Sequence, residues 1–181
     1  MFLVRLLRRD AGPARPPSLL ASAATATFSA DLLRLQLAME PLAAEQYTLE
    51  GEQRALLAYV GDRVKQLNDD ASYDTIYNDI YATGRRLRDL LDRLLIVQHL
   101  RQLQLEVAHA ARQPDQRPEL LLMLLQLRRH EPLADRVAPL VHALLAAGVP
   151  MPDAAALPPP PQCTSSVDEL IAPMLATRAG T

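Results

Sequence analysis

The sequence has few of the residues on which many folds and active sites depend. It contains one cysteine, Cys163, so no disulfide can form within the chain, and a reduced compartment is favoured. It has no tryptophan and only two phenylalanines, so its core must consist mainly of leucine, alanine and valine, as in packed helices. None of its six glycines belongs to a phosphate-binding loop or a nucleophile elbow. These shortages favour packed helices and disfavour an enzyme.

An excess of one charge and a long apolar run are missing as well. The chain has 19 basic and 21 acidic residues and a formal net charge of -2, whereas nucleic-acid-binding proteins usually carry a clear basic excess. Its longest apolar run, Leu120 to Leu125, is much shorter than the about 18 residues expected of a membrane span. We therefore expect no nucleic-acid partner and no transmembrane helix.

Proline and charge divide the chain into three expected parts. Residues 1–28 hold a single acid, Asp10, among arginine, alanine, serine and proline, which is typical of a mitochondrial transit segment. The alternative is a tail that is disordered or wraps a partner. Residues 29–147 carry helical periodicity, and residues 148–181 form a proline-rich arm that ends in a short helix from Val167 to Leu175. The sequence thus predicts an all-α protein, a small irregular helical domain with extended Pro-rich N- and C-terminal arms.

The spacing of apolar residues predicts five helices within the domain. Ser29 and Thr48 are the expected caps of the first two helices. The stretch from Tyr73 to Arg93 is expected to be a hinge that leads into the longest helix. The helix at 119–129 is apolar on nearly every side, so either the domain's own core or a partner subunit must cover it. The expected ranges are 29–40, 48–67, 84–112, 119–129 and 133–147.

The candidate metal-binding and catalytic groups form no complete set. Glu106 lies three residues before His109, but diiron bundles need two such pairs and two further glutamates. The acids between Asp69 and Asp79 lack the spacing and the bidentate glutamate of a calcium-binding loop. We expect no metal, no cofactor and no active site, so the chain is not predicted to be an enzyme.

One stretch of the sequence resembles a known family. Asp74-Thr75-Ile76-Tyr77-Asn78-Asp79 is followed by Arg85-Arg86-Leu87 and then by Asp92-Arg93. This order resembles subunit 7 of mitochondrial ubiquinol-cytochrome c reductase, respiratory complex III, over roughly residues 59–127. The chain departs from the family's pattern at Arg88, where the family has a proline, and it lacks the family's tryptophan.

The resemblance implies an accessory subunit without cofactors, peripheral to the mitochondrial inner membrane on its matrix side, within a large hetero-oligomer. It would pack on cytochrome b and the core subunits and support assembly and electron transport. The residues implied at that contact are Asp74, Tyr77, Asp79, Arg85 and Arg86, whose alternative role is capping and ion pairing within the chain. For the whole chain, the alternatives are a structural subunit of another mitochondrial assembly and a bacterial helical adaptor or secreted interaction protein.

Overall fold

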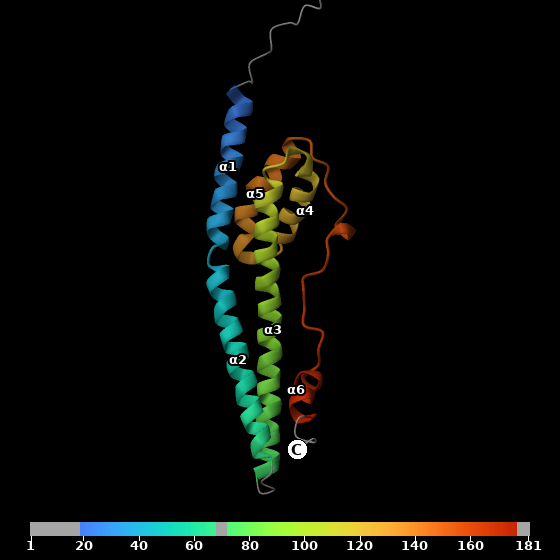
Figure 1. The fold of residues 1–181 in the computed structure, drawn as a ribbon. Coiled ribbons are helices and arrows are strands. Elements are labelled where there is room, and N and C mark those ends of the chain that lie inside the picture. Colours follow the sequence, from blue (N-terminus) through green and yellow to red (C-terminus); the bar gives the residue numbers. More distant parts are fainter. Residues whose placement is uncertain (1–18, 68–71, 177–181) are drawn as a thin grey trace, which may run out of the picture.

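The computed structural model describes residues 19–67 and 72–176, and this part of the chain has six α-helices and no β-strand (Figure 1). The predicted all-α class is therefore confirmed. Short 3-10 turns lie at Pro114–Gln116 and Ala154–Ala156. Residues 1–18, which include most of the expected N-terminal segment, lie outside the described residues. In chain order the helices are α1 (Leu19–Met39), α2 (Leu42–Gln66), α3 (Tyr73–Ala110), α4 (Arg117–Leu127), α5 (Glu131–Ala146) and α6 (Val167–Ala176).

The 38-residue helix α3 is the axis of an elongated molecule. It runs antiparallel to α1 and α2, which follow one another along its length (Figure 1). At one end, α1, α4 and α5 pack with the C-terminal half of α3, and we call this part the bundle. At the other end, α2 and the N-terminal half of α3 form a hairpin, and α6 packs against both of its helices (Figure 1).

Two helix starts differ from the predictions. α1 begins at Leu19 and α2 at Leu42, whereas caps were predicted at Ser29 and Thr48. Each of these two hydroxyls donates instead to the carbonyl oxygen four residues earlier, at 3.0 Å in both cases. Such a bond lets serine or threonine lie inside a helix rather than at its start. The break between α1 and α2 does fall at Pro41, which has no amide hydrogen to continue the helix.

The prediction that Tyr73–Arg93 is a hinge is wrong, because this stretch is helical and forms the first half of α3. The link between α2 and α3 comes earlier, around residues 68–71, which lie outside the described residues. Ile76 and Ile80 are buried at helical spacing, so the apolar stripe of the long helix begins before Gly84 rather than after it. Gly84 therefore lies inside a continuous helix.

Most of the buried side chains form three clusters. The bundle cluster lies among α1, α3, α4 and α5 and contains four leucines of α4, so the domain's own core covers this apolar helix. The middle cluster lies between α2 and α3 and comprises Leu49, Leu90, Leu94 and Val97. The hairpin cluster lies among α2, α3 and α6 and comprises Val60, Val64, Leu67, Ile76, Ile80 and Ile171.

The chain after α5 doubles back along α3. It turns at Gly148, whose φ of 84° lies in the left-handed region that glycine adopts readily after a helix. Residues 149–166, here called the strap, then run beside α3 to α6 (Figure 1). The backbone amide of Cys163 donates a hydrogen bond to the carboxylate of Asp92 on α3. α6 therefore packs on the hairpin, far from α5, the α-helix that precedes it in the sequence.

Candidate interaction surfaces

The five predicted contact residues all lie on the first half of α3, but they face different sides of it. Asp74, Arg85 and Arg86 are exposed, Tyr77 is 38% exposed, and Asp79 is half-buried. Successive residues of an α-helix are about 100° apart around its axis. The five therefore do not form one continuous surface, and only Asp79 and Arg86 line a common hollow.

Asp79 joins α3 to α2 across the hairpin. Its Oδ2 accepts a hydrogen bond from the Tyr59 hydroxyl at 2.6 Å and a charge-assisted one from Arg63 Nε at 2.8 Å. Arg63 Nε also donates to the Tyr59 hydroxyl at 3.0 Å, and its guanidinium lies 5.3 Å from the centre of the Tyr59 ring. The bond with Tyr59, and then the charge of Asp79, raise the pKa of Arg63 above its usual range. The Asp79 carboxylate is thus already engaged within the chain.

Asp79 and Arg86 line an open hollow of about 540 Å³ between α2 and α3. The hydroxyl of Thr83, which is buried, donates to the backbone carbonyl of Asp79 at 2.9 Å and so stays within α3. The lining includes the acids Glu52 and Asp79 and the base Arg86, and these charges of both signs suit the hollow to charged side chains of another protein. Its lining residues are Glu52, Ala55, Leu56 and Tyr59 of α2, and Asp79, Thr83 and Arg86 of α3.

Tyr77 and Arg85 lie among the tyrosines of α3. The Tyr77 ring stacks on that of Tyr73, with centroids 6.1 Å apart and planes 11° from parallel. The Arg85 guanidinium lies 5.3 Å from the centre of the Tyr81 ring. Both contacts join side chains four positions apart, which are neighbours on a helix. Tyr73 and Tyr77 remain 43% and 38% exposed, so this end of the hairpin presents an aromatic surface.

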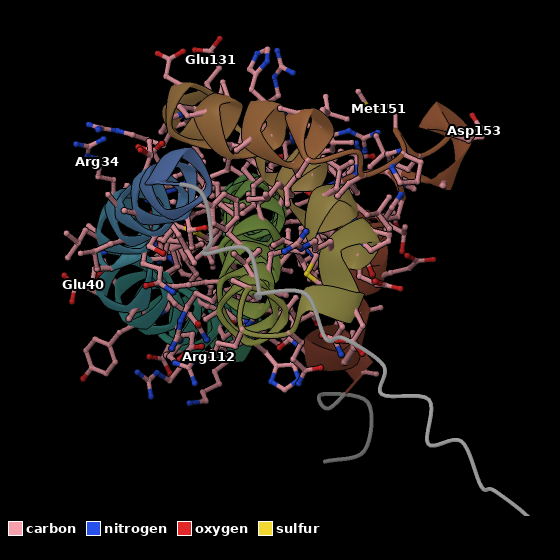
Figure 2. All side chains as sticks on the ribbon, turned by 90° about the horizontal axis from the view of Figure 1, so that it is seen from above. Arg34, Glu40, Arg112, Glu131, Met151 and Asp153 are labelled. Atoms are coloured by element: carbon pink, nitrogen blue, oxygen red, sulfur yellow. The ribbon has the colours of Figure 1, made fainter. Side chains whose placement is uncertain are left out.

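A further surface, which the sequence did not predict, lies between α1 and α3. Leu33 and Leu37 of α1 are each 55% exposed, and Leu105 of α3 is 67% exposed. They line a hollow of about 390 Å³, here called the leucine groove. Seen along the long axis, Glu40 points outward on one side, whereas Met151 and Asp153 of the strap protrude on the opposite side (Figure 2). The other residues that line the groove are Gln36, Glu40, Gln104 and Ala108.

The leucine groove was missed because α1 has two apolar faces. Leu35 and Met39 are four positions apart and are buried in the bundle cluster. Leu33 and Leu37 are also four apart but begin two positions earlier, which places them about 200° around the helix from the first pair. Both pairs follow helical spacing, so periodicity alone does not tell which pair the bundle covers. The signal was the presence of two such pairs rather than one stripe.

Another hollow, of about 470 Å³, lies where α1 meets α2, beside the turn between α4 and α5. Burial, and then the nearby charges of His99 and Arg129, lower the pKa of His130 in its wall. Charges of opposite sign balance around this hollow, so it does not select a ligand of either sign. Its charged and polar lining residues are Glu45, Arg93, Arg129, His130 and Glu131.

Comparison with known proteins gives no precedent for these surfaces, because no protein-family model, curated protein or solved structure matches this chain. Within residues 19–67 and 72–176, no three histidine, cysteine, aspartate or glutamate residues are grouped so that they could hold a metal ion. In the same ranges no helix combines the length and apolar character that crossing a membrane requires. A function must therefore be inferred from the surfaces and the sequence of the chain itself.

Proposed function

We propose that this chain is a non-catalytic helical subunit that binds other proteins, with the leucine groove as its main contact surface. The observation that carries this proposal is the exposure of three leucines on two adjacent helices. Apolar side chains gathered at a surface mark interaction sites. Fully burying one leucine side chain is worth about 1.5–3 kcal/mol, so covering these three, each more than half exposed, stabilises a complex by roughly 3–5 kcal/mol.

The form of the leucine groove suits a helix of the partner. Leu33 and Leu37 lie one turn apart on α1 and face Leu105 across the hollow. A helix that lays an apolar stripe into such a groove is a common mode of recognition. The side-chain amides of Gln36 and Gln104 stand among the lining residues, where they can bond polar side chains of the incoming helix.

The assembly that the resemblance suggests is mitochondrial ubiquinol-cytochrome c reductase, with the chain on the matrix side of the inner membrane against cytochrome b and the core subunits. The exposure of Asp74, Tyr77, Arg85 and Arg86 supports this choice, because these motif residues are accessible to a neighbouring subunit. Asp79 supports it less, because its carboxylate already bonds α2 across the hairpin. A different mitochondrial assembly, or a bacterial adaptor role, would use the same groove with another partner.

Native gels test the proposal when they are run on gently solubilised membranes and soluble extracts from cells that make the tagged chain. Mass spectrometry of the band then identifies the proteins that migrate with it. Migration with cytochrome b supports the complex III assignment. Migration with another assembly refutes complex III and keeps the interaction subunit, whereas migration as a free chain contradicts both.

A pair of charged substitutions tests the leucine groove itself. Leu37→Glu combined with Leu105→Glu places carboxylates where the partner's apolar side chains would lie, and we expect the chain to leave the assembly. The matched control is Tyr47→Glu, which changes a 72% exposed apolar side chain of α2 that is not among the groove residues. Equal loss in both variants would show that the groove has no special role. Arg85→Ala with Arg86→Ala tests the motif surface separately.

A further inference from the structure

α6 packs directly on the backbone of α3 at a glycine. A Cβ atom built on Gly84 would lie 2.7 Å from Val167 Cγ1 and 3.0 Å from Ile171 Cγ2, which is closer than carbon atoms normally approach. Glycine inside a helix lowers the stability of that helix, so its presence there often has a packing reason. Here the bare backbone of Gly84 makes room for a helix that carries β-branched residues four positions apart.

α6 attaches to the hairpin through apolar side chains. The polar groups at its N-terminus form hydrogen bonds with one another. The amide of Glu169 donates to Ser166 Oγ at 3.1 Å, and the amide of Ser166 donates to Glu169 Oε2 at 2.8 Å. This reciprocal pair is a capping box, which stabilises a helix start without help from neighbouring helices. The side chains that α6 buries or half-buries on the hairpin are Val167, Ile171, Met174 and Leu175.

The cluster that α6 covers is separate from the cores of the rest of the molecule. Ile171 is the one buried residue that α6 gives to the hairpin cluster, and the other buried members come from the α2–α3 hairpin. The bundle and middle clusters are built from α1 to α5 and Val149. Lifting α6 therefore uncovers the hairpin cluster and leaves the packing of the bundle in place.

The strap keeps α6 close to this site. It contains Pro158–Pro161, and consecutive prolines favour an extended chain that makes no internal hydrogen bonds. Hydrogen bonds from Arg129 to the Pro158 carbonyl and from the Cys163 amide to Asp92 tether it to the helices. A helix tethered in this way competes for its site at an effective concentration that the length and stiffness of the strap determine.

We propose that the surface under α6 is a binding site for a helix of a partner protein, and that α6 is a built-in competitor for it. The partner helix carries β-branched residues four positions apart, as Val167 and Ile171 are, to lie over Gly84. Apolar residues one turn further on cover Ile76 and Ile80. α6 itself has this pattern of side chains, and its packing on α3 shows that the site accepts a helix of this kind. This site is on the hairpin, and the proposal does not depend on the leucine groove.

The test uses the full chain and a fluorescent synthetic peptide of residues 164–176 as the stand-in for the partner helix. Ile171→Asp in the full chain weakens its own α6, so we expect this variant to bind the peptide at least about ten-fold more tightly than the wild type. Adding Gly84→Leu to Ile171→Asp should abolish the binding, whereas adding Gly61→Leu should not, because no atom lies within 4 Å of a Cβ built on Gly61. A peptide with serine in place of Val167 and Ile171 should not bind.

Equal peptide affinity of the wild type and the Ile171→Asp chain, at equal helix content by circular dichroism, overturns the proposal. The wild-type chain gives a second readout that needs no substitution, because Cys163 in the strap is its only cysteine. Saturating peptide displaces α6 and should speed alkylation of Cys163 by a maleimide, and an unchanged rate also overturns the proposal. Leu37→Glu with Leu105→Glu should leave peptide binding unchanged, so failure of the leucine groove and failure of this site are distinguishable.

Discussion

Replacing Gly84 by alanine sets two opposing effects against each other. Alanine favours an α-helix over glycine by about 0.5–1 kcal/mol. The new methyl group, however, would lie 2.7 Å from Val167 Cγ1 and 3.0 Å from Ile171 Cγ2. Overpacking of this kind costs about 1–3 kcal/mol. We therefore expect Gly84→Ala to lower the free energy of unfolding by about 1 kcal/mol, and by about 2.5 kcal/mol at most.

Gly61→Ala is the matched control for this experiment. Gly61 lies inside α2, and no atom is within 4 Å of a Cβ built there, so only the helix preference acts. We expect this variant to be more stable than the wild type by about 0.5–1 kcal/mol. The assay is urea unfolding followed by far-UV circular dichroism, with the midpoint and the slope compared among the three chains. The difference between the two variants isolates the contact of α6 with α3.

Equal stabilisation by Gly84→Ala and Gly61→Ala would contradict the close packing of α6 on α3, with one exception. α6 is a short helix on a long strap, and it can move outward to make room for the methyl group. That movement would expose the strap, and Cys163 would then react faster with a maleimide than in the wild type. Equal stability together with an unchanged rate of reaction refutes the packing argument.

Three further predictions concern single side chains. Tyr59→Phe removes the hydroxyl that bonds Asp79 and should lower the free energy of unfolding by about 0.5–1 kcal/mol in urea; Tyr47→Phe, at an exposed site, should change it less. Ser166→Ala breaks the cap of α6, a loss of about 0.5–2 kcal/mol in helix stability, and should speed alkylation of the strap cysteine more than Ser165→Ala does. Burial lowers the pKa of His130, so the unfolded chain binds a proton there more tightly than the folded one. The stability linked to His130 should be complete above about pH 6.5 and should fall as the pH drops through its lowered pKa. The midpoint of urea unfolding should therefore fall with pH over this range in the wild type, and His130→Gln should remove that part of the fall.

The parts of the fold that follow local spacing could be predicted from the sequence. Leu87, Leu90 and Leu94 recur at spacings of three and four residues and are buried in α3. The interruption before Tyr73 was also visible, because residues 68–72 are of types that favour turns. The capping box at Ser166 could have been read in the same way, since serine three residues before glutamate is its sequence pattern. In each case the determining contacts lie within a few residues along the chain.

The parts that depend on distant contacts could not be predicted. The sequence predicts the start of the long helix at Gly84, because a glycine ahead of a strong apolar pattern resembles a boundary. Its role depends on Val167 and Ile171, which approach it only after the chain has passed through two more helices and the strap. Leu33 and Leu37 are exposed for a similar reason, since α5 packs on the other face of α1. Periodicity defines faces, and only the tertiary fold decides which face is covered.

The arrangement of cores along α3 argues that the two proposed binding sites act independently. Leu105 follows Gly84 by 21 positions, which at about 1.5 Å per residue separates the leucine groove and the α6 site by roughly 30 Å. Sites so far apart couple only through an element that has two discrete arrangements. α3 is one continuous helix between them, and the clusters beneath the two sites are separate. We therefore expect a partner that displaces α6 to leave the leucine groove unchanged, so that the two proposed sites can be occupied at once.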